Sequence, residues 1–108
     1  MFGMYNIKEM DVDTLDARKD GIHLIDVRTE GEVARGVIGG AIHIPLHLLP
    51  LRADEIPQDR PVVIYCNSGA RSAQACAFMN AKGFANMHNL AGGIMAWARS
   101  GKPLAALS

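Results

Sequence analysis

The sequence has no excess of charge of either sign. Its 108 residues include 11 Lys and Arg against 11 Asp and Glu, which gives a formal net charge of +0. Proteins that hold nucleic acid or anionic membranes electrostatically carry a basic surface, so we expect neither as a partner. Hydrophobic residues make up 49% and charged residues 20%. This composition predicts one globular domain over residues 1–108.

The sequence also lacks long apolar runs and a leader pattern. No apolar run approaches the ~20 residues that a membrane-spanning helix needs. The first ten residues do not show the charged-then-apolar order of a signal peptide. We therefore expect a cytoplasmic protein that has no membrane partner.

Cysteine is scarce. Cys66 and Cys76 are the two cysteines, and they do not form a Cys-x-x-Cys pair. Two cysteines cannot build a disulfide framework, and a cytosol keeps such thiols reduced. His43 and His47 have a spacing that occurs in metal sites, but Pro45 separates them and no cysteine or carboxylate joins them. We therefore expect neither a disulfide scaffold nor a metal site.

The most informative stretch runs from residue 61 to residue 81. Residues 62–65 form an unbroken β-branched and aromatic run, typical of a strand that is buried on both faces. From Ser68 or Gly69 onward the spacing becomes that of a helix. The apolar face that we expect for this helix consists of Ala70, Ala73, Ala77, Phe78 and Ala81. Cys66 is therefore predicted at the carboxyl end of a central strand, where ligands bind in open α/β sheets.

This position gives Cys66 the properties of a nucleophile. Backbone N–H groups at a helix start lack intrahelical partners, and the helix dipole favours negative charge there. A thiol in that field loses its proton more easily. The N–H groups of residues 67–71 can also hold an anion, and Gly69 allows a positive φ or a close approach of the backbone. We predict a nucleophilic sulfur beside an anion-binding loop.

Other residues of the loop have predicted roles. Arg71 is expected to bind an anion, because a cation in the first helical turn is unfavourable unless it meets one. The side chains of Asn67 and Ser68 have two open roles, binding substrate or shaping the turn. Ser72 is expected to cap or brace the loop by local hydrogen bonding. Cys76 is predicted to be a buried structural residue rather than a second reactive thiol.

Strand and helix patterns alternate along the rest of the chain. Strands are predicted at 23–27, 41–44 and 85–90, with an extended lead-in at 6–10, and helices at 11–20, 30–35 and 93–99. A further helix is expected near 46–51, interrupted at Pro50. This alternation predicts a parallel sheet with helices on both faces.

The segment Cys66–Ser72, which reads Cys-Asn-Ser-Gly-Ala-Arg-Ser, resembles the active-site loop of a rhodanese-type sulfurtransferase. Three further segments resemble motifs of that family, in the family's order: Ile25–Arg28, Gly36–Pro45 and Leu90–Trp97. Val37 and His43 depart from the family pattern of His and Asn, and we expect both positions to support the fold. The resemblance covers nearly the whole chain. It implies a rhodanese-like three-layer α/β/α domain with a central, mostly parallel sheet of about five strands.

The resemblance implies transfer of sulfane sulfur without a metal or an organic cofactor. Cys66 would attack the outer sulfur of a donor such as thiosulfate, release sulfite, and carry a persulfide until cyanide or a thiol removes the sulfur. The implied partners are thus a small anionic donor and a thiol or protein acceptor. Asp26 and Arg28 are assigned to structural support. The implied substrate-binding residues are Asn67, Ser68, Gly69, Ala70, Arg71 and Ser72.

Two alternatives stay open. A carrier or interaction module of the same fold would pass sulfur between proteins or only bind a partner. A cysteine phosphatase or arsenate reductase is less favoured, because those enzymes use Cys-x5-Arg, whereas four residues separate Cys66 from Arg71. The smaller ring suits a sulfur atom better, and the loop holds no acidic residue to protonate a leaving alcohol.

Overall fold

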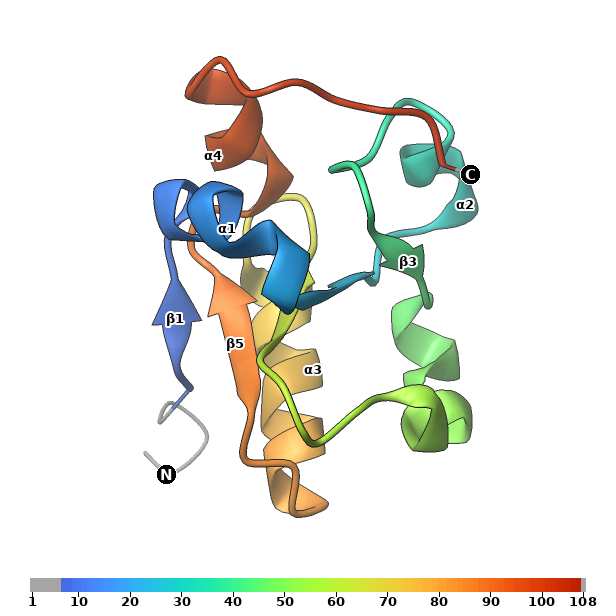
Figure 1. Ribbon diagram of the computed structural model, residues 1–108. Coiled ribbons are helices and arrows are strands. Elements are labelled where there is room, and N and C mark those ends of the chain that lie inside the picture. The colour runs from blue at the N-terminus through green and yellow to red at the C-terminus, as the bar shows by residue number, and fades with distance from the viewer. Residues whose placement is uncertain (1–6, 108) are drawn as a thin grey trace.

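The computed structural model describes residues 7–107 (Figure 1). Five strands form one sheet in the order β1-β5-β4-β2-β3, and every neighbouring pair is parallel. The strands are β1 (Glu9–Met10), β2 (His23–Asp26), β3 (Ile42–His43), β4 (Val62–Tyr65) and β5 (Met87–Leu90). The predicted parallel sheet is confirmed, although most strands are shorter than their sequence patterns. Asn6, part of the predicted lead-in, lies outside the described residues.

Helices cover both faces of the sheet, as the alternation predicts. They are α1 (Val12–Arg18), α2 (Glu30–Val33), α3 (Ala70–Ala81) and α4 (Gly93–Arg99), with 3-10 segments η2 (Lys19–Gly21) and η3 (Leu46–Glu55). No helix in residues 7–107 is long and apolar enough to cross a membrane. The bounds of α4 agree with the pattern at 93–99, and α1 begins after Asp11, whose carboxylate accepts from the Thr14 N–H at 2.8 Å.

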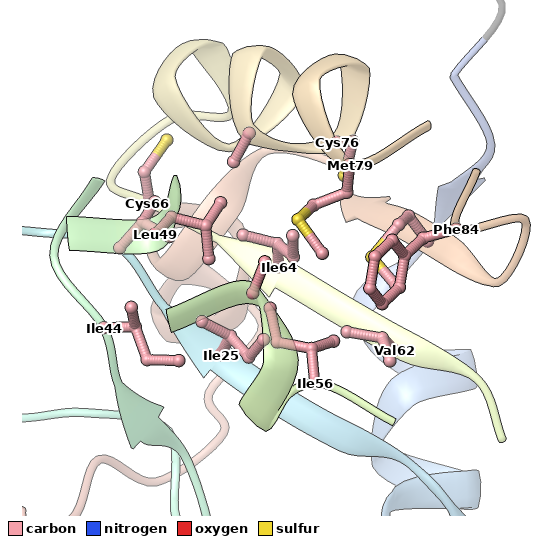
Figure 2. Close-up of a cluster of buried hydrophobic side chains, with 14 residues drawn as sticks. Ile25, Ile44, Leu49, Ile56, Val62, Ile64, Cys66, Cys76, Met79 and Phe84 are labelled. Atoms are coloured by element: carbon pink, nitrogen blue, oxygen red, sulfur yellow. The ribbon is translucent and has the colours of Figure 1, made fainter. Parts of the chain in front are cut away.

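Alternate residues of the central strands build two separate cores. Ile25 and Ile64 point to one face, where α3 and η3 cover them, and Figure 2 shows this cluster beneath the helix. Leu24, Val63 and Tyr65 point to the opposite face, where α1 and α4 cover them. Because all four residues of β4 are buried, this strand reads as a continuous apolar run.

The apolar face predicted for α3 is wrong. The residues of α3 that are buried are Ser72, Ala75, Cys76 and Met79, whereas Phe78 is 36% exposed. Alanine favours helices on any face, so the alanine spacing did not identify the side that packs. The larger Cys76 and Met79 side chains fill the space above the sheet, as Figure 2 shows. Cys76 is buried, as predicted.

The helix expected near residues 46–51 extends further than predicted. Segment η3 continues through Pro50 to Glu55, and its kink lies at Arg52, where φ is −118°. Proline has no N–H to donate, yet Pro50 lies inside this 3-10 segment without ending it. The predicted interruption at Pro50 is therefore displaced by two residues. Leu49 of η3 joins the core beside Cys66 (Figure 2).

Candidate active site

The loop between β4 and α3 places Cys66 as the sequence predicts. β4 ends at Tyr65, and α3 begins at Ala70. β4 is the middle strand of the sheet, so Cys66 lies at its carboxyl end. Gly69, the N-cap of α3, has φ +115°, a conformation that favours glycine. The turn at Gly69 brings the start of α3 back over the cysteine.

Hydrogen-bond donors converge on the sulfur of Cys66. The Gly69 N–H lies 3.1 Å from Sγ, and the N–H and hydroxyl of Ser72 each lie 3.4 Å from it. The residue itself is 1% exposed. Gly69 is one of the residues whose N–H groups are predicted to hold an anion, and in the structure its N–H faces the sulfur itself. The Ser72 amide, which also contacts Sγ, lies beyond the predicted stretch 67–71. Binding of an anion by the amides of that stretch stays a prediction.

These donors lower the pKa of the Cys66 thiol below its ordinary value. Burial alone would raise this pKa, but the Ser72 hydroxyl and the amides of Ser72, Gly69 and Ser68 outweigh it by stabilising the thiolate. Among residues 7–107 no such donor is described for Cys76, and burial raises its pKa to about 12. The two cysteines therefore differ sharply in acidity, and Cys66 is the one poised to react near neutral pH.

Substitution Ser72→Ala removes one of these donors. We expect the pKa of Cys66 to rise, so that activity at neutral pH falls about tenfold, the typical worth of a hydrogen bond to a charged group. The acid limb of the pH–rate profile is expected to shift to higher pH, with recovery under alkaline conditions. A profile of unchanged shape and uniformly lower height would contradict a role for Ser72 in thiolate stabilisation.

The N-terminus of α4 holds the loop from behind. The N–H of Ile94 donates to the Cys66 carbonyl at 3.0 Å, and that of Met95 donates to the Asn67 carbonyl at 3.1 Å. Gly93 has φ +62°, and a Cβ there would lie 2.6 Å and 2.5 Å from the same two oxygens. Gly93 therefore allows the backbone of α4 to pack closely against the loop. These hydrogen bonds hold the carbonyls of Cys66 and Asn67 toward α4, which leaves the N–H groups of the loop on the side of the sulfur.

Ser72 is itself held by Asn89, a residue that the sequence analysis did not single out. The Ser72 hydroxyl has one proton, which it can donate either to Asn89 Oδ1 at 2.5 Å or to Cys66 Sγ at 3.4 Å, and a thiolate at Sγ competes for it. Asn89 Nδ2 donates to Glu9 Oε2 at 3.1 Å and to the Gly69 carbonyl at 3.2 Å. The one available signal was a polar residue in an otherwise buried strand, since Asn89 in β5 is 4% exposed. Ser72 thus braces the loop, as predicted.

Arg71 is paired within the protein. Its guanidinium donates two hydrogen bonds to Glu32, at 2.7 Å to Oε1 and 2.9 Å to Oε2. The sequence predicts an anion that meets this cation at the helix start, and in the structure the Glu32 carboxylate does so. Asn67 donates from its side chain to Met95 Sδ at 3.4 Å, a contact that shapes the turn.

Asp26 and Arg28 form the predicted ion pair. The Arg28 guanidinium contacts Asp26 Oδ2 at 2.8 Å and also donates to the Gly36 carbonyl at 2.8 Å. Both side chains are buried, so the pair fixes the segment after β2 next to the loop that follows α2. Of the two departures from the family pattern, Val37 is buried and His43 is half-buried. Val37 bridges Ala105, and His43 Nε2 contacts the Arg28 carbonyl at 2.6 Å.

A pocket of about 930 Å³ adjoins the loop on the face covered by α3 and η3. Its lining includes Arg71 and Phe78 from α3, and Leu46, Leu48 and Leu49 from η3. Leu49 also packs in the same cluster as Cys66 (Figure 2). In the part of the chain that the structure describes, no three His, Cys, Asp or Glu side chains are grouped to hold a metal ion.

The fold and the loop define a three-layer α/β/α protein with a buried cysteine in a ring of hydrogen-bond donors. The chain belongs to the rhodanese-like domain family, whose model matches residues 11–100. It is 48% identical to a sulfurtransferase of Allochromatium vinosum, over 93% of this chain and 96% of that protein. It is 31% identical to the thiosulfate sulfurtransferase GlpE of Stutzerimonas stutzeri, over 74% of this chain and 73% of that protein.

A solved structure supports the same family and fold. The crystal structure of a rhodanese-related protein from Thermoplasma volcanium matches with a TM-score of 0.87 at 27% identity, covering 93% of this chain and 99% of that chain. The predicted three-layer fold and the predicted family are therefore both confirmed.

Proposed function

We propose that this protein is a sulfurtransferase that carries a sulfane sulfur on Cys66 as a persulfide. The observation that carries the proposal is the convergence of the Gly69 amide and both Ser72 donors on Sγ. Such donors stabilise a thiolate, which is the reactive form of cysteine. The same donors can then stabilise the negative charge of a persulfide.

The reaction consists of two displacements. In the first, the Cys66 thiolate attacks the outer sulfur of a donor, the new S–S bond forms, and the donor's own bond to that sulfur breaks. With thiosulfate, the bond pair leaves on sulfite, and the enzyme retains a persulfide anion. In the second, cyanide or a thiolate attacks the outer sulfur, and the Cys66 thiolate is regenerated. No oxidant is needed, and the sequence of steps gives ping-pong kinetics.

The remaining loop residues have proposed roles in this scheme. Gly69 and Ser72 bind the transferred sulfur through their donors. Asn67, Ser68 and Ala70 shape the loop that surrounds it, since the carbonyl of Asn67 is held by α4 and Ser68 contributes to lowering the pKa of Cys66. Asp26 and Arg28 support the loops without touching the reacting atoms.

Mass spectrometry of the intact protein tests the proposal. After exposure to thiosulfate or mercaptopyruvate, we expect the protein to gain the mass of one sulfur atom, and cyanide or a dithiol should remove it. Steady-state assays with the same donors and acceptors should give parallel lines in a double-reciprocal plot. Hydrolysis of an aryl phosphate without any gain of sulfur would instead support the phosphatase alternative and overturn the proposal.

The second displacement distinguishes a sulfur carrier from the proposed enzyme. A carrier gains the sulfur but passes it to small acceptors slowly, so the persulfide mass would persist in the presence of cyanide. An interaction module gains no sulfur at all. We expect rapid removal, because turnover by small thiophiles is what the proposed enzyme performs.

A further inference from the structure

The charge of the Arg71 guanidinium is matched by Glu32. Two parallel hydrogen bonds, at 2.7 Å and 2.9 Å, occupy one pair of the N–H groups that could bind an oxyanion. A donor that binds to this pair of N–H groups must therefore displace a carboxylate that is part of the protein. Arg71 is also a lining residue of the pocket beside the loop.

Glu32 is itself held firmly in place. Its Oε1 accepts from the Thr29 N–H at 2.9 Å and the Thr29 hydroxyl at 3.1 Å, which completes the capping box of α2. The hydrogen bonds from Arg71 lower the pKa of Glu32 to about 2, so the carboxylate stays charged through the neutral range. Moving Glu32 away would break both the helix cap and the ion pair.

The pocket offers no other available cation. Three of the described residues that line the pocket carry a formal charge when histidine is neutral, namely Arg28, Glu30 and Arg71. Arg28 is paired with Asp26 and Arg71 with Glu32, whereas Glu30 makes none of the ion pairs described for the chain. Counted together with their partners Asp26 and Glu32, which lie outside the lining, these residues carry two positive and three negative charges, and this balance disfavours a dianion such as thiosulfate.

The rest of the pocket wall is apolar. Leu46 and Leu48 are partly buried and contact the core, and Phe78 is 36% exposed. Leu49 connects this wall to the cluster that contains Cys66. A donor with an apolar body would bury its carbon atoms here while its outer sulfur approaches the loop, and the burial would favour binding.

We infer that Glu32 is a specificity-determining residue that directs the site toward sulfane-sulfur donors with an apolar body and at most one negative charge, and away from inorganic thiosulfate. This inference rests on the proposed function. An organic persulfide, R–S–SH, belongs to the favoured class: the Cys66 thiolate attacks its outer sulfur, the R–S bond to that sulfur breaks, and R–S⁻ leaves. The proton stays on the transferred sulfur, so atoms and charge balance.

Two commercial donors separate the classes. Benzenethiosulfonate is a monoanion with an aromatic body, and it releases benzenesulfinate when the thiolate takes its outer sulfur. Thiosulfate is a dianion without such a body. We would measure kcat/KM for both with cyanide as acceptor, at about pH 8, where an ordinary histidine is neutral. The ratio of the two values cancels any change in the reactivity of Cys66 itself.

Glu32→Gln should change this ratio. Glutamine retains the capping box but leaves Arg71 with a net charge, so kcat/KM for thiosulfate should rise about tenfold, as expected for one new charge-assisted hydrogen bond. Once any effect common to both donors is removed, kcat/KM for benzenethiosulfonate should change less than about twofold.

Phe78→Ala tests the apolar wall. It should lower kcat/KM for benzenethiosulfonate about fivefold and leave kcat/KM for thiosulfate nearly unchanged.

Glu55→Gln is the matched control, because it releases Arg52 from a similar ion pair that does not line the pocket. Its donor ratio should equal that of the native protein. An unchanged or lower thiosulfate value in Glu32→Gln, in a variant whose Cys66 still gains sulfur by intact mass, would overturn the inference and leave the proposed function standing. Failure of Cys66 to gain sulfur from either donor would overturn both.

Discussion

Replacing Cys66 with serine is expected to reduce sulfur transfer by at least about 1,000-fold while the protein remains folded. A serine hydroxyl does not ionise near neutral pH, and the same amide donors that stabilise a thiolate cannot make it a comparable nucleophile. The substitution is nearly isosteric. The N–H groups of Gly69 and Ser72, which lie 3.1 Å and 3.4 Å from the sulfur, can donate to the serine oxygen instead.

The measurement is turnover of a sulfane-sulfur donor, together with intact mass and thermal unfolding. Cys76→Ala is the matched control, because Cys76 is also buried but its pKa is raised to about 12. The control should keep most of its activity, with its losses limited to stability. Substantial turnover in Cys66→Ser, or a sulfur adduct that survives in that variant, would show that another group carries the sulfur.

Asp26→Ala is expected to lower the free energy of unfolding by about 3–5 kcal/mol, the typical cost of removing one partner of a buried ion pair. Arg28 would remain buried at 5% exposure with its charge unmatched, and the Gly36 carbonyl would be its main remaining acceptor. The Arg28 backbone N–H, which donates to Asp26 Oδ1 at 2.9 Å, would also lose its partner. Urea unfolding measures the change.

Arg52→Ala provides the comparison for this prediction. It breaks an ion pair at 2.8 Å whose two side chains are 34% and 50% exposed, so the loss of stability is expected to be much smaller than in Asp26→Ala. Equal losses in the two variants would mean that burial of the Asp26–Arg28 pair has no special cost. A larger loss in Asp26→Ala supports the structural role that the resemblance assigned to both residues.

The order of the elements could be predicted because local patterns and tertiary structure agree over most of the chain. The run at 62–65 is apolar on both faces because α3 and η3 cover one side and α1 and α4 the other. Asp11 and Gly69 mark the starts of α1 and α3 through their local chemistry, an N-cap carboxylate and a positive φ. Such signals depend on neighbouring residues alone.

The contacts that organise the site depend on residues far apart in the sequence, and no local pattern reports them. Glu32 and Arg71 are 39 positions apart, so the sequence showed a cation at a helix start and not the carboxylate that meets it. Asn89 lies 17 positions from Ser72. The packed face of α3 also depends on tertiary volume, since small alanines fit either side of a helix.

A pH titration of the thiolate tests the central claim most directly. Ultraviolet absorbance of the thiolate, measured for the native protein with Cys66→Ser as the blank, reports the ionisation of Cys66 alone, because Cys76 ionises only at much higher pH. We predict an apparent pKa clearly below the value of about 8.5 that is typical of cysteine. A value at or above 8.5 would contradict the claim that converging donors hold this sulfur ready to accept and release a single atom.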